Sequence, residues 1–337
     1  MRCNGWLLCG VLGLLLVGCE PQGKSTSESG STTGGSGTAA APVKGFVPEG
    51  AIAPSPETIK SGTYKPLSRP LFLYVNKAVL KKPEAIAFLE YYFSPEGRAL
   101  VGESGYVELD DADYDAQVKL LDDAIKAAGG KASETLNGQV LVDGSSTVAP
   151  ITTAVAEEFS KLHANVRVPV GTSGTGGGFK KFCSGEIDIC DASRGIKDSE
   201  KELCQKAGIE YLEMKVGIDG LTIVVNPKAD WIAGITVEEL KKIWNPESKV
   251  QKWSDINPAY PNAAIKLFGP DTDSGTFEYF TEEICGKKGA SRSDYQQSGD
   301  DNFLVTGVAG DEHALGYFGF AYYIENQGKL KALSVAP

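Results

Sequence analysis

The chain has 337 residues, of which 42% are hydrophobic and 23% are charged, as is usual for a globular protein with its own core. At roughly 100–200 residues per domain, this length allows two domains. The formal net charge of −11 excludes a general nucleic-acid binder, which needs a basic surface, but a small anion can still be held by local dipoles.

The first residues predict a targeting segment. Arg2 precedes a mostly apolar run from Trp6 to Val17, which is shorter than the ~20 residues that a permanent transmembrane helix needs. The tetrapeptide Leu16-Val17-Gly18-Cys19 is similar to a bacterial lipobox. We therefore expect a signal peptide over 1–18 and a lipid on the Cys19 thiol, which would anchor the protein to a membrane in the periplasm or at the cell surface. An ordinary signal peptide or a short membrane anchor is the alternative.

Residues 19–42 are rich in Ser, Gly and Thr and are predicted to form a flexible tether. Of the seven cysteines, Cys3 and Cys9 would leave with the signal peptide. The remaining four permit two disulfides in three pairings: Cys183, Cys190, Cys204 and Cys285. Neither a CxxC pair nor a histidine cluster supports a metal site, so no metal and no cofactor are expected.

Residues 43–128 begin with a proline-containing loop and then read as one strand followed by helices. The strand is Pro70–Val75, and helices are expected over Lys82–Phe93, from Ser94, and over Asp111–Ala128. Residues 129–138 resemble a second linker.

The remainder of the chain alternates between strands and helices. Strands are predicted at Gln139–Asp143, Val166–Val170, Ile187–Ile189, Leu221–Val225, Ile265–Phe268 and within Ala314–Tyr323. Helices are predicted at Ile151–His163, from Phe179–Cys183, at Val237–Trp244 and from Phe277, with a turn into Ile324–Gln327. This alternation predicts an α/β fold with a largely parallel sheet.

Three predicted strand-to-helix junctions carry glycines and small hydroxyl residues: 144–147, 173–177 and 273–276. A helix start offers unpaired N–H groups and the positive end of a dipole, glycine lets an anion approach the backbone, and Ser and Thr add donors. Each loop alone is equally typical of a helix cap or a turn. Residues 171–178 match neither a Walker loop nor a Rossmann fingerprint. Three such loops together predict an oxyanion site.

Four longer motifs carry a specific resemblance: Asp143–Pro150, Gly171–Phe179, Ile187–Arg194 and Asp271–Phe277. They resemble the phosphate-binding protein (PstS) family of ABC phosphate importers, and 217–226, 307–310 and 314–317 agree. The resemblance implies a type II periplasmic-binding-protein fold with two α/β lobes. Each lobe would be a mostly parallel sheet flanked by helices, with a dehydrated phosphate between the lobes.

Carried over by motif, the resemblance implies anion donors in all three loops and a charge partner in the Asp-Ala-Ser-Arg motif. Arg194 would be the charge partner, since a guanidinium can grip two oxygens, with a surface salt bridge as its alternative role. The implied phosphate-binding residues are Ser146, Thr147, Thr175, Gly176, Ser193, Arg194, Ser274, Gly275 and Thr276.

The sequence departs from the family at two places. Pro270 stands where some members carry an arginine, and Arg194 stands where some carry the aspartate that accepts the proton of phosphate. Asp191, Asp271 and Asp273 are candidate substitutes for that aspartate, and the choice between them stays open.

The order of segments also differs, because the part that resembles residues 43–128 comes last in the family. The chain is therefore expected to be circularly permuted, with the family's ends bridged by 129–138, residues 139–225 forming the first part of lobe I and 226–337 most of lobe II. Residues 43–128 would complete lobe I. An unrelated domain over Pro70–Leu121 is the alternative.

The resemblance implies high-affinity capture of inorganic phosphate outside the cytoplasm and delivery to the membrane subunits of an ABC permease, by a monomer that binds no nucleic acid. Another tetrahedral oxyanion such as sulfate, molybdate or tungstate, or a role as a phosphate sensor, is the alternative. An enzyme is not expected, because no nucleophile elbow or metal-ligand spacing is present.

Overall fold

The computed structural model describes residues 45–337 except 132 and 134. The predicted signal peptide, Cys19 and the tether lie outside the described residues. Among the described helices, none combines the length and the apolar character needed to cross a bilayer.

A mixed sheet organises the fold. Its strand order is β10-β9-β11-β7-β1-β6-β3-β5, and β12 also pairs with β7. The strands of this sheet are β1 Ser68–Asn76, β3 Val142–Gly144, β5 Val170–Gly171, β6 Ile189–Ala192, β7 Tyr211–Val225, β9 Lys266–Pro270, β10 Gln296–Ser298, β11 Ala314–Gly319 and β12 Lys331–Ala332. Two smaller pairs are β2 Gly138–Gln139 with β4 Val166–Arg167, and β8 Gly234–Thr236 with β13 Ser334–Ala336.

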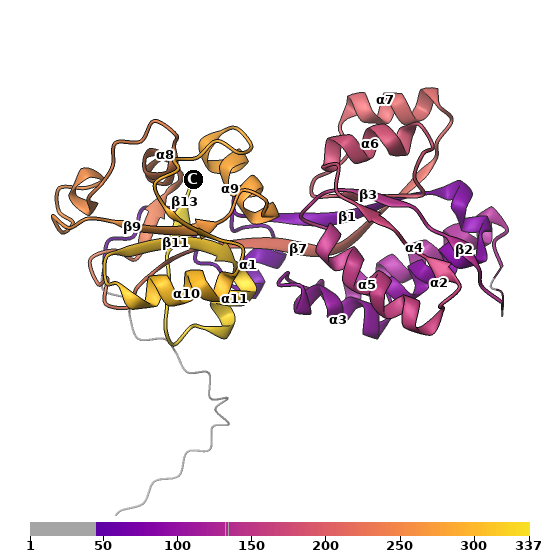
Figure 1. Cartoon of the computed structure of the whole chain (residues 1–337), viewed down its shortest axis with the longest axis horizontal. Helices are drawn as coiled ribbons and strands as arrows, with labels where there is room; N and C mark the ends of the chain where they lie inside the picture. The colour runs from indigo at the N-terminus through magenta and orange to yellow at the C-terminus, as the bar shows by residue number, and fades with distance from the viewer. Residues whose placement is uncertain (1–44, 132, 134) are drawn as a thin grey trace, which may run out of the picture. The chain divides into compact units, whose positions relative to one another are not determined.

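The long strand β7 and its neighbour β1 connect two groups of elements, and Figure 1 shows β7 running between them. Lobe I comprises β1, β6, β3 and β5 with their helices, and lobe II comprises β9, β10 and β11 with theirs. Strands pair in parallel within β5-β3-β6 and within β10-β9-β11, whereas β1 is antiparallel to both β6 and β7, and β7 is antiparallel to β11. The expected parallel sheet is therefore found in each lobe but not at the centre.

Helices flank the sheet largely where the sequence predicts them. They are α1 Pro56–Lys60, α2 Pro83–Tyr92, α3 Pro95–Glu103, α4 Asp111–Ala128, α5 Ala149–Leu162, α6 Thr175–Cys183, α7 Asp198–Lys206, α8 Val237–Trp244, α9 Gly275–Cys285, α10 Asp301–Gly310 and α11 Phe320–Glu325. Short 3₁₀ segments lie at η1 Lys77–Lys81 and η2 Trp253–Asp255.

Two predicted helix starts and two predicted strands differ from the structure. Helix α6 begins at Thr175, inside the glycine-rich loop, and α9 begins at Gly275, so both helices bring their first turns to the loops that the sequence singles out. The predicted strand at 139–143 is split into β2 and β3, as Val166–Val170 is into β4 and β5. Glycine at a helix start lowers helix propensity, which is why composition alone places these starts too late.

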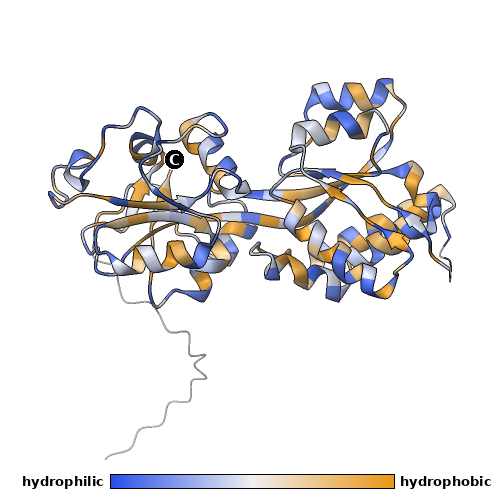
Figure 2. Cartoon of the chain, viewed as in Figure 1, coloured by the Kyte–Doolittle hydropathy of each residue, from blue (hydrophilic) through white to orange (hydrophobic). Residues whose placement is uncertain are grey.

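The first described segment belongs to the same core as the rest of lobe I. Strand β1 is buried from Leu71 to Asn76, and Phe88 of α2 packs edge-on against Phe159 of α5, with ring centroids 5.5 Å apart. Figure 2 shows the hydrophobic residues concentrated along the strands, while the helices alternate between hydrophobic and hydrophilic residues. Residues 68–128 thus supply interior surface to this sheet.

The beginning and the end of the described chain lie side by side in lobe II. The backbones of Ile52 and Val335 exchange two hydrogen bonds of 2.9 Å, and Phe46 forms a parallel bridge with Ile232. Nearby, Phe280 stacks on Tyr317 with ring centroids 3.8 Å apart, and Trp244 packs edge-on against both rings.

Of the four candidate cysteines, Cys183 and Cys204 form a disulfide that joins α6 to α7. Cys190 is a free, buried thiol on β6, and Cys285 is a free thiol at the end of α9. The sequence permits a second bridge, but these two residues lie on separate elements and are unpaired.

Candidate functional site

Two of the three predicted loops meet through a very close backbone approach. Gly275, the first residue of α9, lies against Thr147, and a Cβ placed on Gly275 would come within 2.9 Å of the Thr147 Cα. Real side chains do not tolerate such a distance, so glycine is required there. One residue earlier, the Ser146 hydroxyl donates to Glu278 Oε2 on α9 over 2.7 Å.

Asp143, at the end of β3, holds the glycine-rich loop in place. Its Oδ1 accepts hydrogen bonds from the backbone N–H and the hydroxyl of Ser173, and its Oδ2 is paired with Lys181 of α6. Burial alone would raise the pKa of Asp143, but the hydrogen bonds from Lys181 and Ser173 outweigh it, and the pKa lies below its ordinary value. The Asp143 carboxylate therefore holds the glycine-rich loop 171–178 against the end of β3.

The first turn of α6 leaves its backbone donors open. The helix begins after Gly174, which has a φ of 77° and offers no side-chain cap. The structure records no acceptor for the N–H groups of Thr175 and Gly176 among the described residues. Thr175 also contacts the Asp-Ala-Ser-Arg segment, since its Oγ1 lies 3.2 Å from the Ser193 hydroxyl. Open N–H groups at a helix start are the elementary anion-binding device.

These elements line one cavity of about 560 Å³. Its walls come from the start of β1, the loop before α5, the start of α6, the segment after β6 and one face of α9. The lining residues are Arg69, Pro70, Phe72, Ser145, Ser146, Thr147, Ser173, Gly174, Thr175, Gly176, Ser193, Arg194, Gly195, Lys197, Glu278, Tyr279, Glu282, Glu283 and Lys288.

Six of the nine predicted phosphate-binding residues line this cavity: Ser146, Thr147, Thr175, Gly176, Ser193 and Arg194. The other three, Ser274, Gly275 and Thr276, are not among its lining residues. They nevertheless form the start of α9, where the Ser274 hydroxyl accepts from the Thr276 N–H and Gly275 touches Thr147. Loops 144–147 and 173–177 thus line the cavity, and loop 273–276 contacts the first of them through Gly275 and Thr147.

Arg194 is heavily engaged by protein groups. Its two terminal nitrogens donate to the two carboxylate oxygens of Glu200 over 2.9 and 2.8 Å, and the first also donates to the Gly195 carbonyl. Its guanidinium carbon lies 5.6 Å from the centre of the Phe179 ring. Arg194 therefore lines the cavity while satisfying its alternative role, an ion pair.

None of the three aspartates proposed as proton acceptors lines the cavity. Asp191 is fully buried on β6, where burial raises its pKa to about 8 although Thr152 donates a hydrogen bond to it. Asp271 accepts from the backbone N–H of Asp273, which is exposed. The carboxylates that do line the cavity are Glu278, Glu282 and Glu283, which the motif comparison does not reach.

Arg69 was also missed. It comes from the first part of the chain, yet its guanidinium donates to Thr147 and to Asp219 and lies 3.7 Å from the centre of the Tyr279 ring. The one available signal was a charged residue at the start of an otherwise apolar strand, Ser-Arg-Pro-Leu-Phe-Leu-Tyr-Val. The sequence pattern does not predict which way the Arg69 side chain points.

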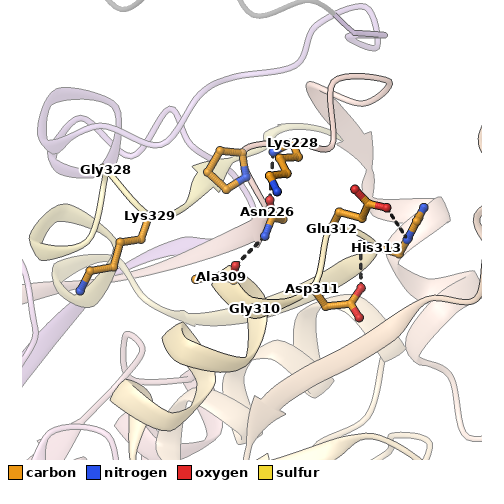
Figure 3. A pocket seen from close by; sticks show the side chains of 10 residues that line it. Asn226, Lys228, Ala309, Gly310, Asp311, Glu312, His313, Gly328 and Lys329 are labelled. Atoms are coloured by element: carbon orange, nitrogen blue, oxygen red, sulfur yellow. Dashed lines mark hydrogen bonds and ion pairs between the residues drawn. The ribbon is translucent and has the colours of Figure 1, made fainter.

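A second cavity lies in lobe II, where Asn226, Asp311 and His313 are among the lining residues (Figure 3). Its polar groups are bonded mainly to one another. The Asn226 amide donates to the Ala309 carbonyl over 2.7 Å, and Asp311 accepts from the His313 backbone N–H over 2.9 Å. It contains none of the predicted donor residues, so the first cavity is the better candidate site.

Comparison with known proteins agrees with this geometry. A family model described as a PBP superfamily domain matches residues 129–335. Protein SphX of Synechococcus elongatus is 54% identical over 198 residues, which cover 58% of this chain and 58% of SphX. Phosphate-binding protein PstS of Staphylococcus saprophyticus is 42% identical over 216 residues, covering 64% of this chain and 66% of PstS.

Among solved structures, a possible phosphate binding protein from Planctomyces limnophilus is similar, with 52% sequence identity and a TM-score of 0.58. The match covers 60% of this chain and 71% of that one. The chain spans less than two thirds of the length of the two curated relatives named above, at 58% and 66%. The type II periplasmic-binding-protein fold expected from the sequence is confirmed.

We predict that Asp143→Ala lowers the free energy of unfolding by about 1–3 kcal/mol at pH 7, because Ser173 and Lys181 lose their acceptor. Since the folded-state pKa is depressed, this stabilisation is present above the ordinary pKa of 3.8 and is lost as the pH falls through the folded-state value. Urea denaturation of both proteins at pH 7 and at pH 3 measures the difference.

The matched control is Asp123→Ala, which breaks the solvent-exposed Lys119–Asp123 pair and should leave the unfolding midpoint unchanged. Equal midpoints for Asp143→Ala and the unsubstituted protein at pH 7 would contradict the role given to Asp143.

Proposed function

Because the chain belongs to the PBP superfamily, we propose that it is an extracytoplasmic binding protein that captures inorganic phosphate with high affinity and delivers it to an ABC importer. The observation that carries the proposal is the open first turn of α6, whose unpaired N–H groups border the same cavity as Ser146, Thr147 and Ser193. Fixed dipoles of this kind replace the hydration shell of a small anion. The phosphate-binding names of its relatives support the same ligand.

In this proposal the anion accepts hydrogen bonds from the backbone of Thr175 and Gly176 and from the hydroxyls of Ser146, Thr147, Thr175 and Ser193. Arg194 adds positive potential at the cavity wall. Ser274, Gly275 and Thr276 would contribute from the start of α9, which lies against Thr147. Binding, not turnover, is the proposed activity.

Glu278 supports phosphate over fully ionised oxyanions. It already accepts a hydrogen bond from Ser146 and is paired with Lys288 at 2.7 Å, so its carboxylate lies directly beside a proposed anion donor. Monohydrogen phosphate carries a proton that such a carboxylate can accept, whereas sulfate, molybdate and tungstate at neutral pH carry none and are repelled. Glu278 would take the place of the family's aspartate.

The proposal also covers where the protein works. A lipid on Cys19 would hold it at the periplasm or cell surface, and residues 20–42 would let the folded part, as a monomer, reach the membrane subunits of its permease.

We further propose that the chain is a circular permutant of its relatives. Two contacts support this: β1 lies between β6 and β7, and Ile52 pairs with Val335. The segment 129–138 would then be the added connection, between α4 and β2. A family order in which residues 45–128 follow residue 337 would need only a short connection, because both ends lie at the same place.

Isothermal titration should give a phosphate dissociation constant of about 1 μM or tighter, with sulfate at least about 100-fold weaker. The reason is the combination of open donors and a neighbouring carboxylate. Equal affinities for phosphate and sulfate would reject the selectivity, and tighter binding of molybdate or tungstate would move the assignment to another tetrahedral oxyanion.

Substituting Glu278→Gln should narrow the ratio between phosphate and sulfate affinities at least about tenfold, since the amide removes the repulsion of sulfate and weakens the acceptor for the phosphate proton. Glu282→Gln is the matched control, because it removes the same charge from the same helix face without touching Ser146. It should change both affinities by the same factor. A ratio altered equally by both variants would show that Glu278 acts only through its long-range charge.

A rearranged chain that begins at Leu136, runs to Pro337, continues through a short Gly/Ser linker into Gly45 and ends at Ala128 should fold and bind phosphate within about threefold of the original. Circular dichroism and titration measure both properties. Failure of this chain to fold cooperatively would reject the proposed permutation.

A further inference from the structure

Arg69 lies on β1 and contacts two other walls of the cavity, the loop before α5 and α9. It precedes the buried stretch of β1 and stands directly opposite Asp219 of β7 in the antiparallel register. Its Nε donates to Asp219 Oδ2 over 3.2 Å and its Nη2 donates to Thr147 Oγ1 over 3.1 Å. The guanidinium lies on the face of Tyr279, so its plane is fixed as well as its position.

We propose that Arg69 is the principal positive ligand of the bound anion, that Asp219 positions it, and that Arg194 has the lesser part. This inference rests on the proposed function, because it concerns the same cavity. It assigns the positive charge that faces the anion to a residue within 45–128. The four motifs that carry the family resemblance all lie after residue 142.

Two of the other three cations that line the cavity are paired with carboxylates, and the third is exposed to solvent. Arg194 directs both terminal nitrogens at Glu200, whose carboxylate also accepts from the Lys197 backbone. Lys288 is paired with Glu278, and Lys197 is exposed to solvent. Arg69 differs because its ion pair with Asp219 is made through Nε and not through the terminal nitrogens.

The free edge of the Arg69 fork is its terminal pair of nitrogens. Among the described residues, the structure records one hydrogen bond from Nη2 and none from Nη1. Thr147, the acceptor of that bond, is itself one of the proposed anion donors and is 2% exposed. An anion beside Thr147 therefore lies within reach of a guanidinium that can offer two parallel N–H groups.

Burial makes this arrangement effective. The Arg69 side chain is 16% exposed and the Asp219 side chain 2%, so solvent screens the guanidinium little. The partner carboxylate prevents Arg69 from turning toward the interior, and the Tyr279 ring prevents it from turning toward α9. A guanidinium held in this way loses little conformational entropy when an anion binds.

The decisive experiment compares phosphate titrations of variants that keep the fold. Arg69→Gln with Asp219→Asn removes both partners of the buried pair with near-isosteric neutral groups, which avoids leaving a lone buried charge. We expect it to weaken phosphate binding about 10-fold to 150-fold, the range for loss of hydrogen bonds to a charged group. Arg69→Lys keeps the charge but not the planar guanidinium. Its phosphate affinity should lie between that of the unsubstituted protein and that of the double variant.

The matched control is Arg98→Gln with Asp111→Asn. Arg98 also pairs with an aspartate, over 3.1 Å, and also lies over a tyrosine ring, that of Tyr114, but it does not line the cavity. This control should leave phosphate affinity unchanged. Thermal unfolding of every variant shows that the protein titrated is folded.

Asp219→Asn alone tests the positioning role. It should weaken phosphate binding in the unsubstituted chain but have no further effect when Arg69 is already Gln, which a purely structural role would not produce. Folded Arg69→Gln/Asp219→Asn protein with unchanged phosphate affinity would overturn the inference while leaving phosphate binding established. If the unsubstituted protein binds sulfate or molybdate in place of phosphate, the proposed function fails, and the same series titrated with that anion decides the role of Arg69. Binding of none of these anions rejects both.

Discussion

The candidate site depends on the contact between Gly275 and Thr147. It sets the first turn of α9 directly on the loop between β3 and α5, with only 2.9 Å from the Thr147 Cα to the position that a Cβ would occupy. A contact between two backbones has no side-chain freedom to absorb an error, so it fixes the distance between the two loops. The bond from Ser146 to Glu278 spans the same two elements and depends on that distance. Any side chain at position 275 would push α9 away from the loop and lengthen this bond.

Local charges and dipoles decide whether an acidic protein can bind an anion in this cavity. The net charge of −11 works against binding at long range, yet an anion inside the cavity responds mainly to the dipoles and charges at its walls. Glu283 reflects this local character, because burial raises its pKa, as does the neighbouring Glu282, while Arg69 lowers it. The cavity therefore combines N–H groups that have no acceptor among the described residues with three carboxylates in its wall.

The sequence predicts most elements, and six of the nine predicted phosphate-binding residues line the cavity, because those features are local. The hydroxyl and glycine residues of 144–147 and 173–177 follow strands and precede helices within a few residues, so their spacing alone brings backbone donors to the end of a sheet. The direction of β1 relative to β7 is not local. Apolar periodicity predicts that Leu71–Val75 is a buried strand but contains no information about its neighbours or its polarity.

Arg69 and Glu278 escaped prediction for the same reason. Each is a single charged residue whose meaning depends on pairing between segments far apart in the chain: Arg69 with Asp219, 150 residues away, and Glu278 with Ser146, 132 residues away. For Arg194, the motif reports which residue is present and not what it is bonded to. Glu200, six residues further on, supplies the bidentate partner that the motif does not include.

The order of segments along the chain is physically secondary to the pairing of strands. Hydrogen bonds between β1 and β7 require correct register, which the match of Arg69 with Asp219 exemplifies, but they do not depend on which strand is synthesised first. A permutation requires that the two ends of the original chain lie close enough to be joined. The Ile52–Val335 bridge holds the beginning and the end of the described chain close together. Residues 45–128 also cannot be a dispensable addition, because β1 carries Arg69 into the cavity and supplies the central strand of the sheet. A site whose charge and donors come from opposite parts of the chain requires that both parts fold as one unit.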